Sequence, residues 1–296
     1  MSILIPSHCR FLAALTLGGG LAASAFAQTA APAIAFPAPS PAATIKQRVG
    51  LTDIEIVYSR PSVKGRKIFG GLEPYGVVWR TGANNPTKIT FSTPVKFGGT
   101  AVPAGSYGLY SIPGETEWTI ILNKIGEKDW GAYAYKAEND IARAKVKPTV
   151  LAPPVETFTI GIGDIKTESA ALNLMWATTR VSVKLEVDVV GKLRPQIEAV
   201  MASNAEKKPY FQAAMFYFEN GGDLKQALAW MDAGLKEQPA AFFMVYRKGL
   251  ILAKLGDKAG ALAAAKASRE AAAKDDRASL RDEYLRLNDA LIASLK

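Results

Sequence analysis

The sequence predicts an α+β protein in two domains. An antiparallel β-sandwich or barrel is expected over residues 44–190, and an all-α repeat of tetratricopeptide-like helical hairpins over 196–296. Short runs rich in β-branched residues, separated by Gly/Pro turns and by no helix of crossover length, predict the first domain. A Gly-Asp motif predicts the second, because it recurs after 34 residues, between Gly222 and Gly256.

The β region offers clear strand signals, since apolar and polar residues alternate within short runs bounded by turn residues. The predicted strands cover residues 53–58, 87–92, 94–97, 107–112, 118–123, 156–160, 170–176 and 181–187. Tyr133, Ala137 and Ile141 recur at helical spacing and predict a short helix within 130–145. The prolines at 148, 153 and 154 predict a loop after that helix.

The helical region contains two related units. Each Gly-Asp pair is expected to end one helix and cap the next, because Gly tolerates the left-handed conformation and Asp accepts backbone N–H bonds. A further helix over 284–295 is expected to cap the stack, since two units fall short of the usual three. A stack of this kind presents a concave helical surface, so the repeat predicts a protein partner.

The N-terminus carries the pattern of a secretory signal peptide over residues 1–27. Arg10 precedes an apolar run, and Ala25-Phe26-Ala27 matches the small-x-small cleavage rule. A membrane anchor would need about 20 apolar residues, and Gly18-Gly19-Gly20 interrupts this run. The sequence therefore predicts a periplasmic or secreted protein with no membrane span after cleavage. The Ala/Pro-rich segment 28–43 is expected to be a linker.

Cleavage would remove His8 and Cys9, the only histidine and cysteine in the chain. Their loss excludes Ser-His-Asp and Cys-His nucleophiles, and also zinc sites built from thiolate or imidazole. Phosphate-loop and dinucleotide motifs are missing too, so no cofactor, metal or catalytic residue is predicted. The formal charge is +9, or +8 once Arg10 is removed, but no dense Lys/Arg run indicates nucleic-acid binding.

Residues 58–85 form the most unusual stretch, because cations, glycines and aromatic residues alternate there. Arginine guanidiniums are forked donors for a carboxylate or phosphate, and flat aromatic rings suit sugars. The predicted ligand-binding residues are Arg60, Arg66, Trp79, Arg80, Asn84, Tyr107, Trp118, Trp130 and Tyr133. A purely structural role fits the same residues: the arginines would donate hydrogen bonds to loop carbonyls, and the tryptophans would lie in the core. We call this arrangement a structural clasp. Two or more unpaired, converging guanidiniums would indicate a site.

Two functions therefore stay open. The first is a non-enzymatic binding protein for an anionic or sugar-like ligand. The alternative is a hydrolase of envelope polysaccharide, which needs two carboxyl groups roughly 5–10 Å apart in a cleft. The carboxylates available for it are Glu73, Glu115, Glu117, Asp129, Glu138 and Asp140.

The motifs of the β region also resemble a known family. They are YSRPS from Tyr58, GR from Gly65, IFG from Ile68, PYG from Pro74, WRTGAN from Trp79, PAG from Pro103, IPG from Ile112 and WGAY from Trp130, with Trp118 and Asn123. Together they resemble the signature of a bacterial exported family, domain of unknown function 2911, over residues 45–190. That family usually has Glu where this chain has Asn85. The resemblance implies an exported β domain, often followed by helical repeats, and no established activity.

Overall fold

A computed structural model describes residues 36–124 and 135–296. The predicted signal peptide, residues 28–35 of the predicted linker, and Trp130 and Tyr133 lie outside these ranges. The last two residues of the predicted linker, Ala42 and Ala43, belong to the first strand.

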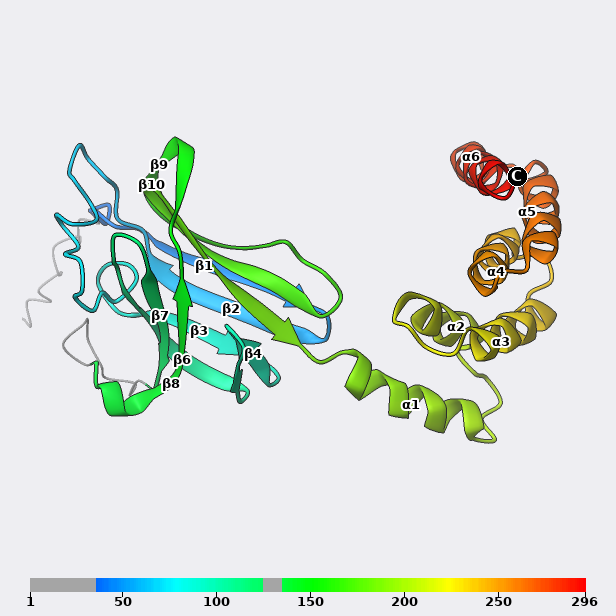
Figure 1. Cartoon of the computed structure of the whole chain (residues 1–296), viewed down its shortest axis with the longest axis horizontal. Coiled ribbons are helices and arrows are strands. Elements are labelled where there is room, and N and C mark those ends of the chain that lie inside the picture. Colours follow the sequence, from blue (N-terminus) through cyan, green and yellow to red (C-terminus); the bar gives the residue numbers. More distant parts are fainter. Residues whose placement is uncertain (1–35, 125–134) are drawn as a thin grey trace, which may run out of the picture. The chain divides into compact units, whose positions relative to one another are not determined.

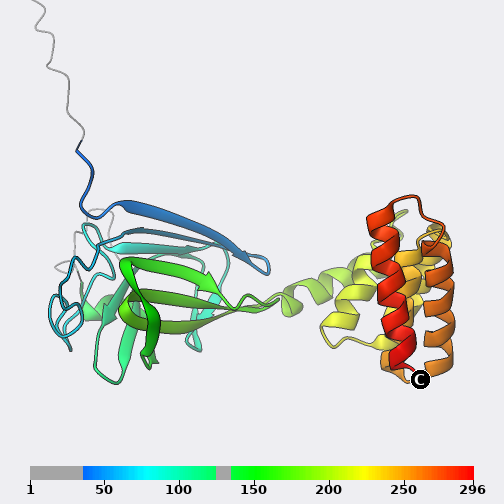
Figure 2. The same ribbon diagram turned by 90° about the horizontal axis from the view of Figure 1, so that it is seen from above.

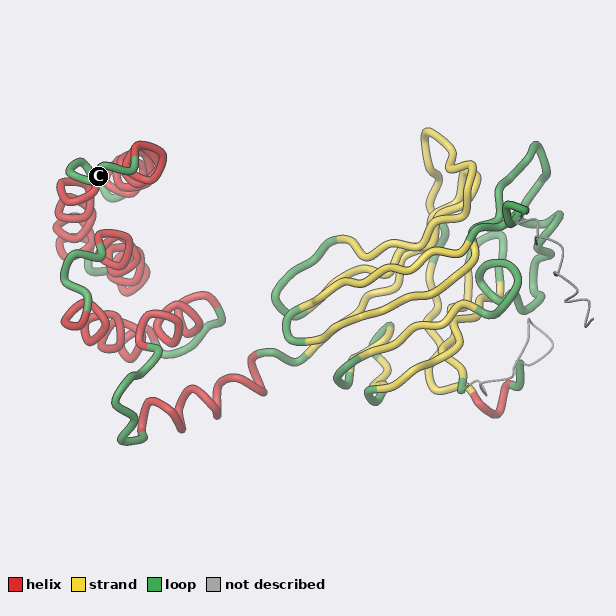
Figure 3. The backbone as a smooth tube through the Cα atoms, turned by 180° about the vertical axis from the view of Figure 1, so that it is seen from behind, coloured by secondary structure: helices red, strands yellow, loops and turns green. Residues whose placement is uncertain are grey.

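The β domain consists of two antiparallel sheets (Figures 1 and 3). One sheet has the order β1-β2-β3-β6-β7-β8, and the other has the order β5-β4-β10-β9. The strands are β1 Ala42–Val49, β2 Thr52–Ser59, β3 Thr87–Phe91, β4 Val95–Phe97, β5 Thr100–Val102, β6 Gly105–Ile112, β7 Trp118–Asn123, β8 Asp140–Val146, β9 Thr149–Gly163 and β10 Ser169–Val187.

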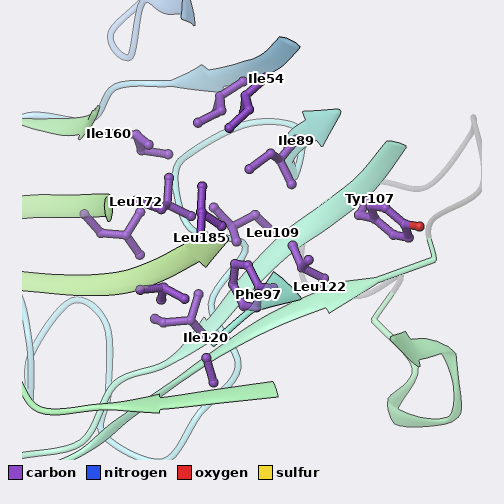
Figure 4. Close-up of a cluster of buried hydrophobic side chains, with 14 of the residues drawn as sticks. Ile54, Ile89, Phe97, Tyr107, Leu109, Ile120, Leu122, Ile160, Leu172 and Leu185 are labelled. Carbon is purple, nitrogen blue, oxygen red and sulfur yellow. The ribbon is translucent and has the colours of Figure 1, made fainter. Parts of the chain in front are cut away.

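One hydrophobic core lies between the two sheets (Figure 4). Strand β2 illustrates how the sequence builds it: Thr52, Ile54, Ile56 and Tyr58 are buried, whereas the residues between them are more exposed. This period of two directs alternate side chains to the same face of a sheet. Buried side chains of the first sheet pack with those of the second, including Phe97, Ile160, Leu172 and Leu185. The predicted antiparallel β-sandwich is therefore confirmed.

The predicted helix within residues 130–145 is wrong over its described part. Only the short 3₁₀ turn η2, Ala137–Asn139, is helical there, and Asp140–Val146 forms strand β8 against β7. Ala142 and Ala144 are buried while Arg143 and Lys145 are exposed, so the period of two prevails over the helical spacing.

The predicted loop at Pro153-Pro154 is also wrong, because both prolines lie inside β9. Strand β9 is at the edge of its sheet, where a missing backbone N–H breaks no ladder. Its partner β10 joins two strands that were predicted separately. The two halves meet at an irregularity near Ala177, whose φ is 51°.

The helical region contains six helices among the described residues. Their bounds are α1 Val190–Ala202, α2 Tyr210–Glu219, α3 Leu224–Glu237, α4 Phe242–Leu255, α5 Lys258–Ala272 and α6 Ala278–Ser294. None of the helices that the structure describes is both long enough and apolar enough to span a bilayer.

The two Gly-Asp motifs cap helices as predicted. Asp223 accepts the backbone N–H of Lys225 at the start of α3, and Asp257 accepts that of Gly260 in α5, both at 2.8 Å. Gly256 ends α4 in the left-handed conformation, with φ 87°. At the first motif the expected glycine was wrong, because Gly221, with φ 69°, takes this conformation instead of Gly222. The hairpin repeat is therefore confirmed, as pairs α2–α3 and α4–α5.

Helix α6 covers the last hairpin, which confirms the predicted terminal helix (Figure 2). Leu291 of α6 is buried against Tyr246 and Ala265. A Cβ at Gly249 of α4 would lie 3.2 Å from Leu291 Cδ2, so a small residue is required for this close packing.

Candidate functional site

The candidate site is the long loop between β2 and β3, at one end of the β domain (Figure 1). Backbone hydrogen bonds tie this loop to both sheets. Val63 donates to the carbonyl of Glu156 in β9, and Trp79 exchanges two bonds with Ser111 in β6. The loop is therefore a fixed part of the sandwich, and its side chains are held in place.

Two of the three predicted arginines bind protein carbonyls. Arg60 donates from Nε to the carbonyl of Phe158 at 3.0 Å and from Nη2 to Thr159 Oγ1 at 2.7 Å. The exposed Arg66 donates to the carbonyls of Val63 and Ser62 within its own loop. These contacts are those of a clasp, and they keep two guanidiniums from converging unpaired. A ligand role for either residue stays a prediction.

Three of the predicted aromatic residues lie in the core. Trp79 stacks on Trp176 at 5.7 Å and donates from Nε1 to the carbonyl of Gly82 at 3.0 Å. Trp118 packs edge-on against Phe69, with ring centroids 4.6 Å apart. Tyr107 is buried as well, and its hydroxyl donates to the carbonyl of Pro103 at 2.9 Å. The structure thus uses these rings for packing, and their contact with a ligand stays a prediction.

The end of the loop is strained. Thr81 is fully buried and has φ 54°, which is rare for a β-branched residue and costs on the order of 1–3 kcal/mol. Its carbonyl accepts the hydroxyl of Thr87 at 2.6 Å, and its own hydroxyl bonds Ser111 Oγ. Asn84 also has a positive φ, 59°, and its exposed side chain donates to Ser59 Oγ at 3.2 Å. Several bonds hold this conformation in place.

Glu73 and Arg80 form the electrostatic centre of the loop. Burial raises the pKa of the Glu73 carboxyl from 4.5 to about 7, although the charges of Arg80 and Arg66 lower that pKa. Among the described residues, neither the Glu73 carboxyl nor the Arg80 guanidinium makes a hydrogen bond or salt bridge. Arg80 is half-buried and acts on Glu73 through its field alone. Of the three predicted arginines, it is the one left available for a ligand.

Sequence reasoning considered Glu73 only as one of six spare carboxylates. Its environment depends on a turn in which Glu73 donates to the carbonyl of Ile68 and accepts from Gly70 N–H, both at 2.9 Å. The glycines around it were the available signal for such a turn. No motif in the sequence could show that the turn half-buries a carboxyl.

The other carboxylates proposed for hydrolysis have different surroundings. Glu117 pairs with Lys145 at 2.8 Å, and Asp140 bonds Arg143 at 2.6 Å, whereas Asp129 lies outside the described residues. In the ranges that the structure covers, no group of three or more acidic, histidine or cysteine side chains is arranged to hold a metal ion.

The comparison with known families agrees with the motifs of this domain. The model described as "Protein of unknown function (DUF2911)" matches residues 40–185, from just before β1 to near the end of β10. The β domain of this chain therefore belongs to this family. No curated protein and no solved structure matches the chain. The DUF2911 description assigns no activity, so the function has to be argued from the loop itself.

Proposed function

We propose that this DUF2911 protein is exported and acts as a non-enzymatic binding protein. Its β domain binds an anionic ligand at Arg80, and its helical hairpins contact a protein partner. The observation that carries the ligand proposal is the half-buried guanidinium of Arg80, which makes no hydrogen bond or salt bridge within the described chain. The support for a protein partner is the pair of stacked hairpins, because such stacks offer extended surfaces.

An anion suits Arg80 for a physical reason. A guanidinium that is partly removed from water gains most from a carboxylate or phosphate that accepts two parallel N–H bonds. The field of Arg66 favours the same charge, since it also lowers the pKa of Glu73. The loop is already fixed by backbone bonds, so little conformational freedom would be lost on binding.

Glu73 makes this binding depend on pH. An ionised Glu73 repels an incoming anion, whereas a protonated Glu73 does not. The negative charge of a bound anion raises the pKa of Glu73, so by reciprocity protonation of Glu73 increases the affinity for the anion. Because this pKa is about 7, the increase is expected as the pH falls from 8 to 6.

Two measurements test the proposal. The full chain, expressed in a Gram-negative host, should be recovered from the periplasm with Gln28 as its first residue by mass spectrometry. The purified protein is then screened by thermal shift against carboxylates, phosphates and neutral sugars at constant ionic strength. At a pH of about 5, where Glu73 is protonated in the folded protein, Arg80→Met should abolish the response to anions and keep the basal Tm. Arg60→Met should lower the basal Tm and keep the response. Cytoplasmic retention, or an anion response that survives Arg80→Met, would refute the proposal.

The hydrolase alternative lacks comparable support. It needs two carboxyl groups in one cleft, and Glu117 and Asp140 are engaged with cations. We therefore propose binding rather than catalysis.

A further inference from the structure

Three exposed apolar side chains are close together in the sequence of the same loop. Leu72, Tyr75 and Val77 are 43%, 39% and 53% exposed, and they fall within six consecutive residues. We call these three residues the apolar tip. Single exposed hydrophobic residues are common on protein surfaces, but a group of them indicates an interaction surface. The described part of the chain has eight exposed large hydrophobic side chains, so this short segment holds three of them.

The backbone keeps the apolar tip in this exposed position. Leu72 donates to the carbonyl of Lys67 at 3.0 Å, and Gly76 donates to that of Pro113 at 2.8 Å. Gly70, with φ 73°, lies directly against the ring of Tyr75, since a Cβ there would be 2.6 Å from Tyr75 Cε2. These contacts fix the backbone of the segment that carries the exposed side chains.

Exposed cations precede the apolar tip in the same loop. Lys64, Arg66 and Lys67 are exposed, and Glu73 is the single carboxylate between Arg60 and Asn85. The segment 64–77 therefore has a net charge of +2 with Glu73 ionised and +3 with Glu73 protonated. Exposed apolar side chains combined with Lys and Arg in one segment are typical of protein surfaces that lie on anionic lipid.

We propose that the apolar tip docks on an anionic phospholipid surface. Leu72 and Val77 enter the boundary between headgroups and acyl chains, and Tyr75 lies at the level of the headgroups, where its ring and hydroxyl are both accommodated. Lys64, Arg66 and Lys67 lie over the lipid phosphates. The location rests on the export proposed above, because an exported protein in a bacterial envelope meets phospholipid leaflets, but the docking does not depend on a ligand at Arg80.

A lipid surface fits the apolar tip better than a protein partner does. A stable protein interface buries about 800 Å² on each side and requires complementary shapes. Three half-exposed side chains supply only a fraction of that area. A bilayer adapts to the side chains that enter it, and its surface potential attracts the cations from a distance.

The test is vesicle co-sedimentation of residues 28–296. This fragment contains the whole described fold and omits the apolar run near the N-terminus, which would bind lipid by itself. Vesicles of phosphatidylglycerol and phosphatidylethanolamine should bind the protein at 100 mM salt, and vesicles of phosphatidylcholine alone should bind at least tenfold less. Binding should weaken further as salt rises, because the cations contribute to it.

Matched variants separate docking from general stickiness. The double variant Leu72→Ser/Val77→Ser should bind anionic vesicles at least fivefold more weakly. Leu51→Ser/Ile165→Ser removes two side chains of similar exposure elsewhere on the β domain and should bind like the wild type. Lys64→Gln/Lys67→Gln should also weaken binding, whereas Lys166→Gln/Lys207→Gln should not. The Tm of each variant shows that it is folded.

Three results would overturn the proposal: no binding to anionic vesicles, unchanged binding of Leu72→Ser/Val77→Ser, or an equal loss in the Leu51→Ser/Ile165→Ser control. Failure here is distinguishable from failure of the ligand site. If vesicles do not bind while soluble anions still raise the Tm through Arg80, the lipid proposal is wrong and the anion site stands. If the protein binds vesicles and no soluble anion raises its Tm, the anion site is wrong and the lipid proposal stands.

Discussion

Substituting Glu73 by Gln is expected to stabilise the protein above pH 7. Burial raises the pKa of Glu73 from 4.5 to about 7 in the folded state. As the pH rises from 4.5 to 7, the unfolded chain loses this proton before the folded chain does, so the wild-type stability falls across this window and the loss is complete above pH 7. At 1.36 kcal/mol for each pKa unit, the loss is at most about 3 kcal/mol. Glu73 is partly exposed, so solvent screening reduces it to about 1–2 kcal/mol.

Glutamine has nearly the size of glutamate and no charge at any pH. Glu73→Gln should therefore match the wild type at pH 4 and exceed it by about 1–2 kcal/mol at pH 8, which corresponds to about 3–6 °C in Tm for a domain of this size. Tryptophan fluorescence follows the unfolding, since Trp79, Trp118 and Trp176 are buried in the β domain. Glu115→Gln is the matched control, because Glu115 is an exposed carboxylate on the β6–β7 turn. Parallel pH profiles of the two variants would refute the reasoning.

Three further predictions concern the clasp, the field of Arg80 and the helix caps. Arg60→Met should destabilise the β domain by about 2 kcal/mol in urea unfolding, because hydrogen bonds from a charged group are lost at a partly buried position. Substitution of the exposed Arg66 by Met should cost less than about 1 kcal/mol. An equal cost for the two variants would contradict the structural role of Arg60. Arg80→Met should raise the pKa of Glu73 above 7 in a ¹³C NMR titration, because the charge of Arg80 lowers this pKa more than that of Arg66 does. An unchanged or lower pKa would contradict this electrostatic effect of Arg80. Asp257→Ala should cost about 1 kcal/mol of helical stability by circular dichroism, through loss of the α5 cap, and no change would show that the cap contributes nothing.

The sequence was informative wherever structure follows from neighbouring residues. Strand β2 was predictable because alternate residues from Thr52 onward face the core. The caps of α3 and α5 were predictable because Asp223 and Asp257 accept hydrogen bonds from residues two or three positions later in the chain. Strand β8 was mistaken for part of a helix because Tyr133, Ala137 and Ile141 recur at helical spacing, and only the pairing with β7 shows that the chain is extended from Asp140. Only residues 156–160 of the long β9 were predicted as a strand, because the two prolines before them are usually loop residues but are tolerated at a sheet edge.

The candidate site was predictable as a segment but not as a geometry. Composition alone identified the loop as unusual. Arg60, however, meets Phe158 and Thr159, which are 98 and 99 residues away along the chain. Nothing in the order of residues shows such partners, so the sequence left clasp and ligand site as equal alternatives. The groups named around Glu73 are close to it in the chain, but the order of residues does not show how far the turn buries its carboxyl.

We propose that the structural arginines and the anion-binding arginine are parts of one rigid loop. Arg60 and Arg66 bind carbonyls and fix the loop, while Arg80 lies on the same loop and makes no such bond. Thr81, next to Arg80, keeps a strained φ of 54° that a glycine would adopt without cost. A loop that merely covered the end of a sandwich would gain stability by relaxing that strain. The hydrogen bonds of Thr81 with Thr87 and Ser111 offset that strain and fix the backbone beside Arg80, and a rigid backbone is what the proposed anion site requires.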